Sequence, residues 1–356
     1  MNNSKSTQVN PRLFWIDLIR ATATFMVVFL HSAAPVVVDP KKVPLKNWMI
    51  SNIYDSSVRT CIPLFFMISG ALLIIKNEQI KEYFGKRIRK VVVPLLMWSI
   101  FFVLWNAALR NNWHTNLEDW TSILYKPSNY HLWFFYPLLG IYLVIPIVRN
   151  ILQKNTESTN FWILLFWFVT SAELPFIGYY ISSIIKGYDL ILLNFLGFAI
   201  LGYYLSKIKI TKKGFLASIV IFIISVLVTA IGTYYLTKRN EFILDDSLYE
   251  FFTINVILAA GSLFIFFRHL GSTVSSLKDS FVGVLINEIN KKSLGIIFIH
   301  PVFIFLLSKD RLGFTLSGFS GNPIYSIPLT AFVVFGISYL TTAILQKIPV
   351  IRYSVP

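Results

Sequence analysis

The sequence predicts an all-α, polytopic membrane protein with about ten transmembrane helices and both termini in the cytoplasm. Hydrophobic residues make up 55% of the 356 residues, whereas charged residues make up only 14%. Apolar runs near or above the roughly 18 residues that span a bilayer recur from end to end, and the charged residues collect between them. Segments on the side of the termini hold about twice as many Lys and Arg as the others, which places that side in the cytoplasm.

The apolar runs define the helices in order. The first run carries ionisable residues and is too long for a signal-peptide core, so we interpret it as a span. The second has a polar face, the third follows a basic segment, the fourth begins among aromatic residues, the fifth ends near an acid and the ninth contains a His-Pro pair; the others are plain apolar runs. The expected bounds are 13–38, 48–75, 91–109, 131–148, 161–178, 188–206, 214–236, 250–267, 293–308 and 323–345.

No connecting segment is long enough for a separate soluble domain. Residues 1–356 are therefore expected to form a single integral membrane domain, with a polar tail over 1–11 and a short C-terminal tail over 346–356.

Composition and motifs exclude several functions. The formal net charge is +15, but no basic soluble stretch studded with aromatic residues exists, so we expect no nucleic-acid partner. Cys61 is the single cysteine, which excludes an internal disulfide and a cysteine-based metal site, and we expect no metal. No serine-hydrolase, zinc-protease or P-loop motif occurs in a credible setting. The chemistry is therefore expected within the membrane.

The first span carries a polar stripe. At about 100° and 1.5 Å per residue, Arg20 and His31 return to within about 20° of each other and lie about 16 Å apart along the helix axis. Asp17 and Thr24 fall on the same face. A charged side chain facing lipid costs about 2.5–3.5 kcal/mol, so the stripe is expected to face the protein interior.

The second span repeats this pattern with Asn52, Asp55, Ser56 and Arg59 at helical spacing. The two polar faces would line one cavity, although each acid could instead pair locally with its arginine and only fix helix packing. His31 has no acid within one turn, and an imidazole suits proton transfer near neutral pH.

Other segments carry weaker candidates. The basic segment over 76–94 anchors the inward side, meets anionic lipid, or binds a phosphorylated cytosolic substrate.

Five further residues are candidate substrate ligands, each with a structural alternative. His131 could meet an acceptor, whereas Trp133 and Tyr136 also suit an aromatic belt. Glu173 lines the cavity or reaches the interface. His300 precedes Pro301, where a kink would expose it, or packs in the bundle.

Five motifs together resemble the acyltransferase-3 family of integral membrane O-acyltransferases. Arg20 and His31 match its R-x10-H signature. They are followed in the family's order by "VRTCIPLFFMISGALL", "FGKRIRKVVVP", "HLWFFYPLLGIYLVIP" and "SLGIIFIHP". The resemblance extends from residue 12 to about 305.

The resemblance implies that His31 is the catalytic histidine and Arg20 its partner. It implies that Arg87 and Lys90 help to bind acyl-coenzyme A, here with lysine in place of a second arginine, and we add Arg59 to these donor-binding candidates. His31 would act as general base or as transient acyl carrier.

We therefore expect a multi-pass acyltransferase of a bacterial cytoplasmic membrane, in contact with the lipid bilayer. It would move an acyl group, expected to be acetyl, from cytosolic acetyl-CoA to a hydroxyl of an extracytoplasmic or lipid-linked cell-envelope glycan. A transporter of a small polar solute is the main alternative and a membrane sensor a third; the sequence leaves a homo-oligomer open.

Overall fold

The computed structural model describes residues 13–110, 115, 117–172, 191–311 and 313–356, and helices are the only regular elements among them. Eight helical segments of the described chain are long and apolar enough to cross a membrane. These findings confirm an all-helical, polytopic membrane protein, while the number of spans and the side of the termini stay predictions. The eight segments are Phe14–Val38, Leu45–Leu73, Ile80–Leu109, Leu132–Lys154, Lys212–Arg239, Ser247–Thr273, Phe281–Ser308 and Pro323–Leu345.

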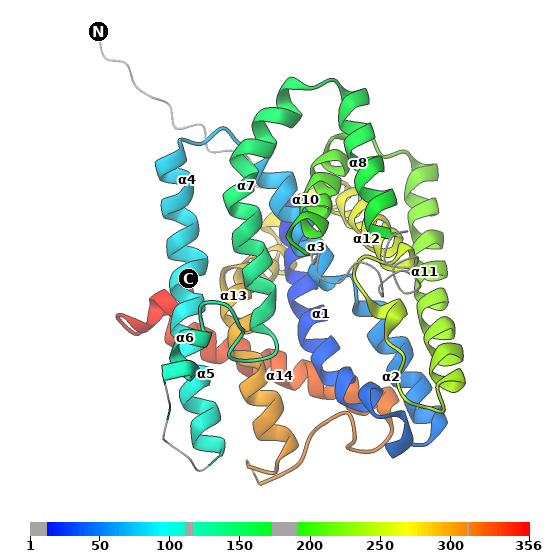
Figure 1. Cartoon of the computed structure of the whole chain (residues 1–356), viewed down its shortest axis with the longest axis vertical. Helices are drawn as coiled ribbons and strands as arrows, with labels where there is room; N and C mark the ends of the chain where they lie inside the picture. Colours follow the sequence, from blue (N-terminus) through cyan, green and yellow to red (C-terminus); the bar gives the residue numbers. More distant parts are fainter. Residues whose placement is uncertain (1–12, 111–114, 116, 173–190, 312) are drawn as a thin grey trace.

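Figure 1 shows the order and arrangement of the helices. Their bounds are α1 Phe14–Val38, α2 Leu45–Val58, α3 Cys61–Leu73, α4 Ile80–Arg87, η2 Ile88–Val92, α5 Val93–Leu109, α6 Leu117–Ser122, η3 Leu132–Phe134, α7 Phe135–Lys154, α8 Glu157–Ala172, α10 Ile191–Lys207, α11 Lys212–Arg239, α12 Ile254–Thr273, α13 Phe281–Ser308 and α14 Pro323–Leu345. Short helical turns η1 Pro40–Lys42, η4 Ser247–Tyr249, η5 Ser275–Asp279 and η6 Ile351–Ser354 join or follow them. The α3–α4 and α7–α8 connections lie at the top of the bundle in Figure 1, and the α1–α2 connection lies at the bottom.

The helix predicted over 48–75 is divided into α2 and α3 at Arg59 and Thr60. Pro63 explains the division, because it has no N–H to bond the Arg59 carbonyl four residues earlier. Arg59 thereby becomes the C-cap of α2. The largest differences at the other boundaries are two helix starts: α13 begins at Phe281 rather than at 293, and a helix already begins at Ile80 within the predicted basic connection.

The basic segment enters the bundle through one wide helical turn. Ile88–Val92 is π-helical, and the Val93 N–H bonds the Ile88 carbonyl five residues back. Pro94 leaves the Lys90 carbonyl without its α-helical donor, and a π turn is a common way to accommodate such a site.

Helix α1 is central and runs parallel to α13. The Thr24 hydroxyl donates to the Arg20 carbonyl and lies 2.8 Å from it, so the Ser293 hydroxyl, 2.7 Å from Thr24, is the donor in their mutual bond. Seven residues later, His31 meets His300 with the same sequence offset of 269. Two contacts two turns apart hold the helices in one register.

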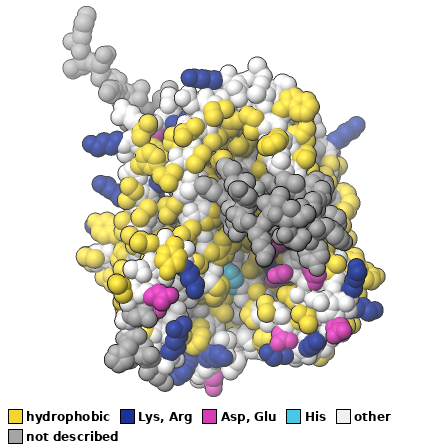
Figure 2. Space-filling model, viewed as in Figure 1, with side chains coloured by type: hydrophobic (Ala, Val, Ile, Leu, Met, Phe, Trp, Pro, Cys, Tyr) yellow, Lys and Arg dark blue, Asp and Glu magenta, His cyan; other side chains and the backbone are white. Residues whose placement is uncertain are grey.

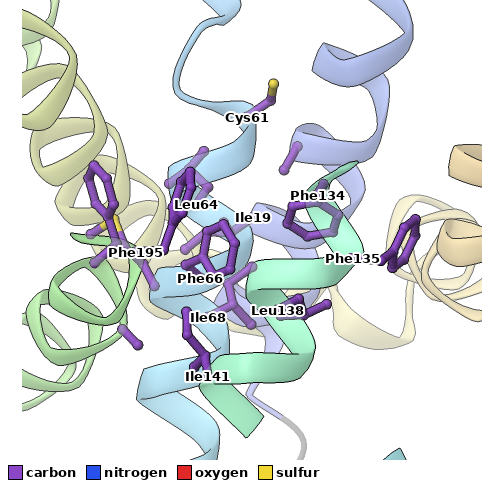
Figure 3. Packing of buried hydrophobic residues seen from close by; sticks show 14 of the residues in the cluster. Ile19, Cys61, Leu64, Phe66, Ile68, Phe134, Phe135, Leu138, Ile141 and Phe195 are labelled. Atoms are coloured by element: carbon purple, nitrogen blue, oxygen red, sulfur yellow. The ribbon is translucent and has the colours of Figure 1, made fainter. Parts of the chain in front are cut away.

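Helices α3 and α10 cross at backbone distance. A Cβ at Gly70 would lie 1.8 Å from the Ala199 carbonyl oxygen, and a Cβ at Gly202 would lie 2.0 Å from that of Met67. Small residues allow such approach in membrane bundles, where dispersion rather than water release drives helix association. Beside this crossing, Phe66 of α3 and Phe195 of α10 stack within the core, together with Phe134 (Figure 3).

The outer surface suits lipid. On α11, the exposed side chains of Val220, Ile224, Leu227 and Ile231 recur at helical spacing. Hydrophobic side chains cover much of the face in Figure 2, and Lys and Arg lie mainly toward its edges. This distribution is the one expected when hydrocarbon surrounds the middle of the molecule.

Candidate functional site

A cavity of about 930 Å³ lies among α1, α3, α4, α7 and α13. We call it the basic cavity, because six of its lining residues are cationic and only two are acidic. Asp17 and Arg20 border it from α1. The cations are Arg20, Lys76, Lys86, Arg87, Lys90 and Lys291.

One carboxylate organises the mouth of the basic cavity. Glu78 accepts hydrogen bonds from Lys76 at 2.6 Å, Lys86 at 3.1 Å and Arg87 at 2.7 Å. Burial raises the pKa of Glu78, but the hydrogen bonds from these three cations outweigh it and hold the pKa at about 2. Arg87 also donates to the Tyr83 carbonyl and lies over the Tyr83 ring, so its guanidinium has a fixed position.

A second cavity, of about 290 Å³, is lined by the predicted catalytic residue His31. We call it the histidine cavity. Its lining residues come from α1, from the end of α2 and the first turns of α3, from η3 and the two residues before it, and from two separate positions, Phe251 and Ile297. The full set is Val27, Leu30, His31, Arg59, Cys61, Ile62, Phe65, Tyr130, His131, Trp133, Phe134, Phe251 and Ile297.

The His-Pro pair of α13 fixes the protonation pattern of His300. Pro301 has no N–H for the carbonyl of Ile297, and His300 Nδ1 lies 2.8 Å from that carbonyl oxygen. An oxygen of this kind only accepts, so Nδ1 carries the proton. In the neutral ring, Nε2 is then an acceptor.

His31 completes a directed chain of hydrogen bonds. His31 Nδ1 lies 2.8 Å from His300 Nε2, and because that nitrogen accepts, His31 Nδ1 donates. The lone pair of His31 is therefore on Nε2, the nitrogen left for a substrate. The two rings are nearly parallel at 13°, and the Tyr130 ring meets His31 edge-on at 5.0 Å. The backbone carbonyl of Ile297 thus orients a base through an intervening histidine.

His131 lies in the same cavity but has both nitrogens engaged. Its Nε2 contacts the Phe298 carbonyl at 3.2 Å, and its Nδ1 contacts the side chain of Asn129 at 3.1 Å. Its ring centroid is 5.4 Å from that of His300. These bonds support a positioning role for His131 rather than that of a free base.

Arg59 borders the histidine cavity and not the basic cavity. Its guanidinium pairs with the buried carboxylate of Asp55, as the spacing of the second span predicts, and lies 4.1 Å from the centre of the Tyr249 ring. The break at Pro63 is the reason that α2 ends here and presents Arg59 beside Cys61. Arg59 is therefore separated from Arg87 and Lys90, with which the sequence grouped it.

The remaining candidates are distributed unevenly. Trp133 borders the histidine cavity and stacks on Phe251. Tyr136 borders neither cavity, and its hydroxyl donates to the Ile123 carbonyl at 2.7 Å, which ties a connecting segment to α7. Glu173 lies outside the described residues.

Two residues of the site were not singled out from the sequence. Tyr130 precedes His131 in the aromatic segment, and Glu78 is an acid within a basic stretch. A local signal existed only for Glu78, since an acid among lysines suggests pairing. The contact between Tyr130 and His31 joins residues 99 positions apart and depends on how the segment before η3 lies against α1.

Among the described residues, no group of three or more His, Cys, Asp or Glu is arranged to hold a metal ion. His31 and His300 share a hydrogen bond, and His131 meets His300 through a ring contact.

Comparison with known proteins identifies the family of the chain. Searches of curated proteins and of solved structures find no match to the chain. The acyltransferase-3 family model, described as an acyltransferase domain, matches residues 13–343. That match extends from α1 into α14 and includes the histidine cavity, the histidine chain and every lining residue of the basic cavity except Gln346 and Pro356. The protein therefore belongs to the acyltransferase-3 family and is a membrane acyltransferase.

Proposed function

We propose that the protein transfers an acyl group, acetyl in the first instance, from cytosolic acyl-CoA to a hydroxyl of a cell-envelope glycan or its lipid-linked precursor. One observation carries the proposal: a histidine with an oriented, unprotonated Nε2 borders a cavity that adjoins a second, strongly basic one. A nucleotide thioester needs both features, a cationic pocket for its phosphates and a base at its acyl end.

The basic cavity fits the donor by charge. Arg87 and Lys90 stand on the turn that leads into the bundle, and Arg20 lies deeper on α1. Six cations against two acids leave an excess of positive charge for phosphates. Arg87 offers a planar guanidinium that Glu78 holds in place, whereas Lys90 contributes a point charge.

His31 acts on the acceptor hydroxyl. Its Nε2 takes the hydroxyl proton while the oxygen forms a bond to the thioester carbonyl carbon, and the carbon–sulfur bond then breaks. The imidazolium returns the proton to the departing thiolate, so an ester and a free thiol result. In the alternative order, Nε2 first accepts the acyl group and then passes it to the hydroxyl. In either case, His300 Nε2 accepts the hydrogen bond from His31 Nδ1 and stabilises the positive charge on the His31 ring.

Arg59 is the cation beside this base. We assign to it the stabilisation of negative charge that develops on the thioester oxygen, because it borders the same cavity as His31 and Asp55 fixes it. Arg20, which the resemblance implies to be the catalytic partner of His31, borders the basic cavity and lies about 16 Å from His31 along α1, so we assign it to donor binding.

The proposed sidedness places the basic cavity at the cytoplasm of a bacterial cell. The α3–α4 connection, which carries the cavity mouth, is on the predicted inward side, and the α1–α2 connection is on the outward side. The acceptor would then enter the histidine cavity from the outward side.

The test uses purified protein in lipid nanodiscs with radiolabelled acetyl-CoA and a crude envelope glycan fraction. Transfer of label, or release of free thiol, should disappear in His31→Ala and persist in His269→Ala. His269 is a matched control, because it packs against Phe215 away from both cavities. Lys90→Gln should raise the KM for acetyl-CoA more than it lowers kcat.

A different result would support transport. Donor-independent uptake of a solute by proteoliposomes, unaffected by His31→Ala and without thiol release, would contradict the proposal. Labelling of a cysteine introduced at Lys81 only from outside the cell would contradict the sidedness.

A further inference from the structure

The two cavities share three lining residues, Phe65, Phe134 and Ile297. Phe134 and Ile297 are each only 3% exposed, and the rings of Phe65 and Phe134 lie 5.7 Å apart. A side chain that borders two cavities forms the wall between them. The wall comes from α3, η3 and α13 and consists only of hydrocarbon.

The order of residues along each helix shows that the cavities lie end to end. On α3, the basic cavity is lined from Leu73 back to Phe65, and the histidine cavity is lined from Phe65 back to Cys61. On α7 and η3, the basic cavity is lined from Tyr142 back to Phe134.

The same order holds on α13 and α1. On α13, the basic cavity is lined from Asn287 to Ile297, a rise of about 15 Å. On α1, the basic cavity is lined by Asp17 and Arg20, and the histidine cavity begins at Val27. Between those levels, the bond from Ser293 to Thr24 closes α1 against α13. On its own segment of chain, each of the three wall residues is thus the residue lining the basic cavity that lies farthest from the cavity mouth.

We propose that Phe65, Phe134 and Ile297 are specificity-determining residues that limit the size of the acyl group reaching His31. The inference rests on the proposed function, because it takes the donor to enter through the basic cavity. The thioester end must pass between these side chains to reach the histidine cavity. A packed apolar aperture rejects each additional methylene steeply, by about 10- to 200-fold. The wall also keeps water and ions of the basic cavity from the base, as apolar constrictions do in channels.

The single cysteine provides a readout that does not need catalysis. Cys61 is buried, borders the histidine cavity and does not border the basic cavity. A small anionic methanethiosulfonate, applied to sealed vesicles from the side of the basic cavity, must cross the wall to reach it. Residual free thiol is then measured with a fluorescent maleimide after denaturation in detergent.

The test compares wall variants with a neighbour. Ile297→Ala and the milder Phe65→Leu should each raise the rate of Cys61 modification from the basic side by about tenfold or more. Leu138→Ala is the matched control, because Leu138 is one turn from Phe134 and borders only the basic cavity. It should leave the rate unchanged, and Cys61→Ser should abolish the signal.

The same variants are assayed with acetyl-, butyryl- and hexanoyl-CoA. In Ile297→Ala and Phe65→Leu, kcat/KM for hexanoyl-CoA relative to acetyl-CoA should rise by about tenfold or more, with no such rise in Leu138→Ala. If both readouts equal those of the wild type, the wall does not limit passage and the inference fails. A third outcome is that Cys61 modification accelerates in the wall variants, but neither they nor the wild type transfer any acyl group. In that case the proposed function and the proposed selection of acyl groups both fail, whereas the barrier between the cavities is confirmed.

Discussion

Replacement of His300 by phenylalanine tests the hydrogen-bond chain behind His31. Phenylalanine preserves an aromatic ring of similar size on α13, but it removes the acceptor 2.8 Å from His31 Nδ1 and the donor 2.8 Å from the Ile297 carbonyl. Without the acceptor, nothing fixes the His31 proton on Nδ1, and the fraction of rings with Nε2 free as a base falls.

The expected loss follows from the charge change during the reaction. A neutral hydrogen bond contributes about 0.5–1.5 kcal/mol, and one to a charged group about 1.5–3 kcal/mol. Only the increase in hydrogen-bond strength that occurs when His31 becomes an imidazolium affects kcat. Together with the loss of the correct tautomer, we expect a decrease of about 1.4–2.7 kcal/mol in transition-state stabilisation, or about 10- to 100-fold in kcat.

The assay is steady-state release of thiol from acetyl-CoA in nanodiscs, with thermal unfolding measured in parallel. The KM for acetyl-CoA should change little, because His300 is not in the basic cavity. His300→Gln should recover part of the activity, since its amide oxygen is an acceptor for His31 Nδ1. A His300→Phe protein that is folded and retains kcat within about twofold would refute the reasoning, because the loss of an orienting hydrogen bond of this strength should lower kcat by more than that.

The remaining predictions concern charge pairs and packing. Glu78 has a pKa of about 2 in the folded protein, below its ordinary value, so its contribution to stability is complete above about pH 4.5 and is lost as the pH falls toward 2. Glu78→Gln should therefore lower the melting temperature at pH 7. It should also reduce the difference in melting temperature between pH 7 and pH 3. Arg59→Gln leaves Asp55 as an unpaired buried charge and should destabilise the protein by about 3–5 kcal/mol, whereas Asp55→Asn combined with Arg59→Gln should restore folding but not kcat; a double variant as active as the wild type would exclude Arg59 from the chemistry. Gly202→Leu should abolish a monodisperse peak in size-exclusion chromatography, because its Cβ meets the α3 backbone; unchanged elution would contradict the close crossing of α3 and α10.

The fold class could be predicted from the sequence because the bilayer imposes length and polarity on every span. The polar stripe of α1 also placed Asp17, Arg20 and His31 inside the bundle, where the structure finds them. Helix boundaries were predicted less accurately where a proline lacks the N–H that would bond the carbonyl four residues before it. Pro63 divides α2 from α3 at Arg59, and this division moved Arg59 from the predicted donor-binding group to the side of His31.

The sequence by itself determined a helical membrane protein of the acyltransferase-3 family, with a histidine and an arginine on one inward face. The fold class and the shared face depend on composition and on residues close together in the chain, which periodicity reveals, whereas the family is identified by the resemblance of five motifs and by the family model. Only the tertiary structure decided that His300 orients His31, that Glu78 gathers three cations, and that Phe65, Phe134 and Ile297 separate two cavities. The physical reason is that each of these arrangements depends on how distant helices align, and the register of α1 against α13 is set by packing contacts 269 residues apart.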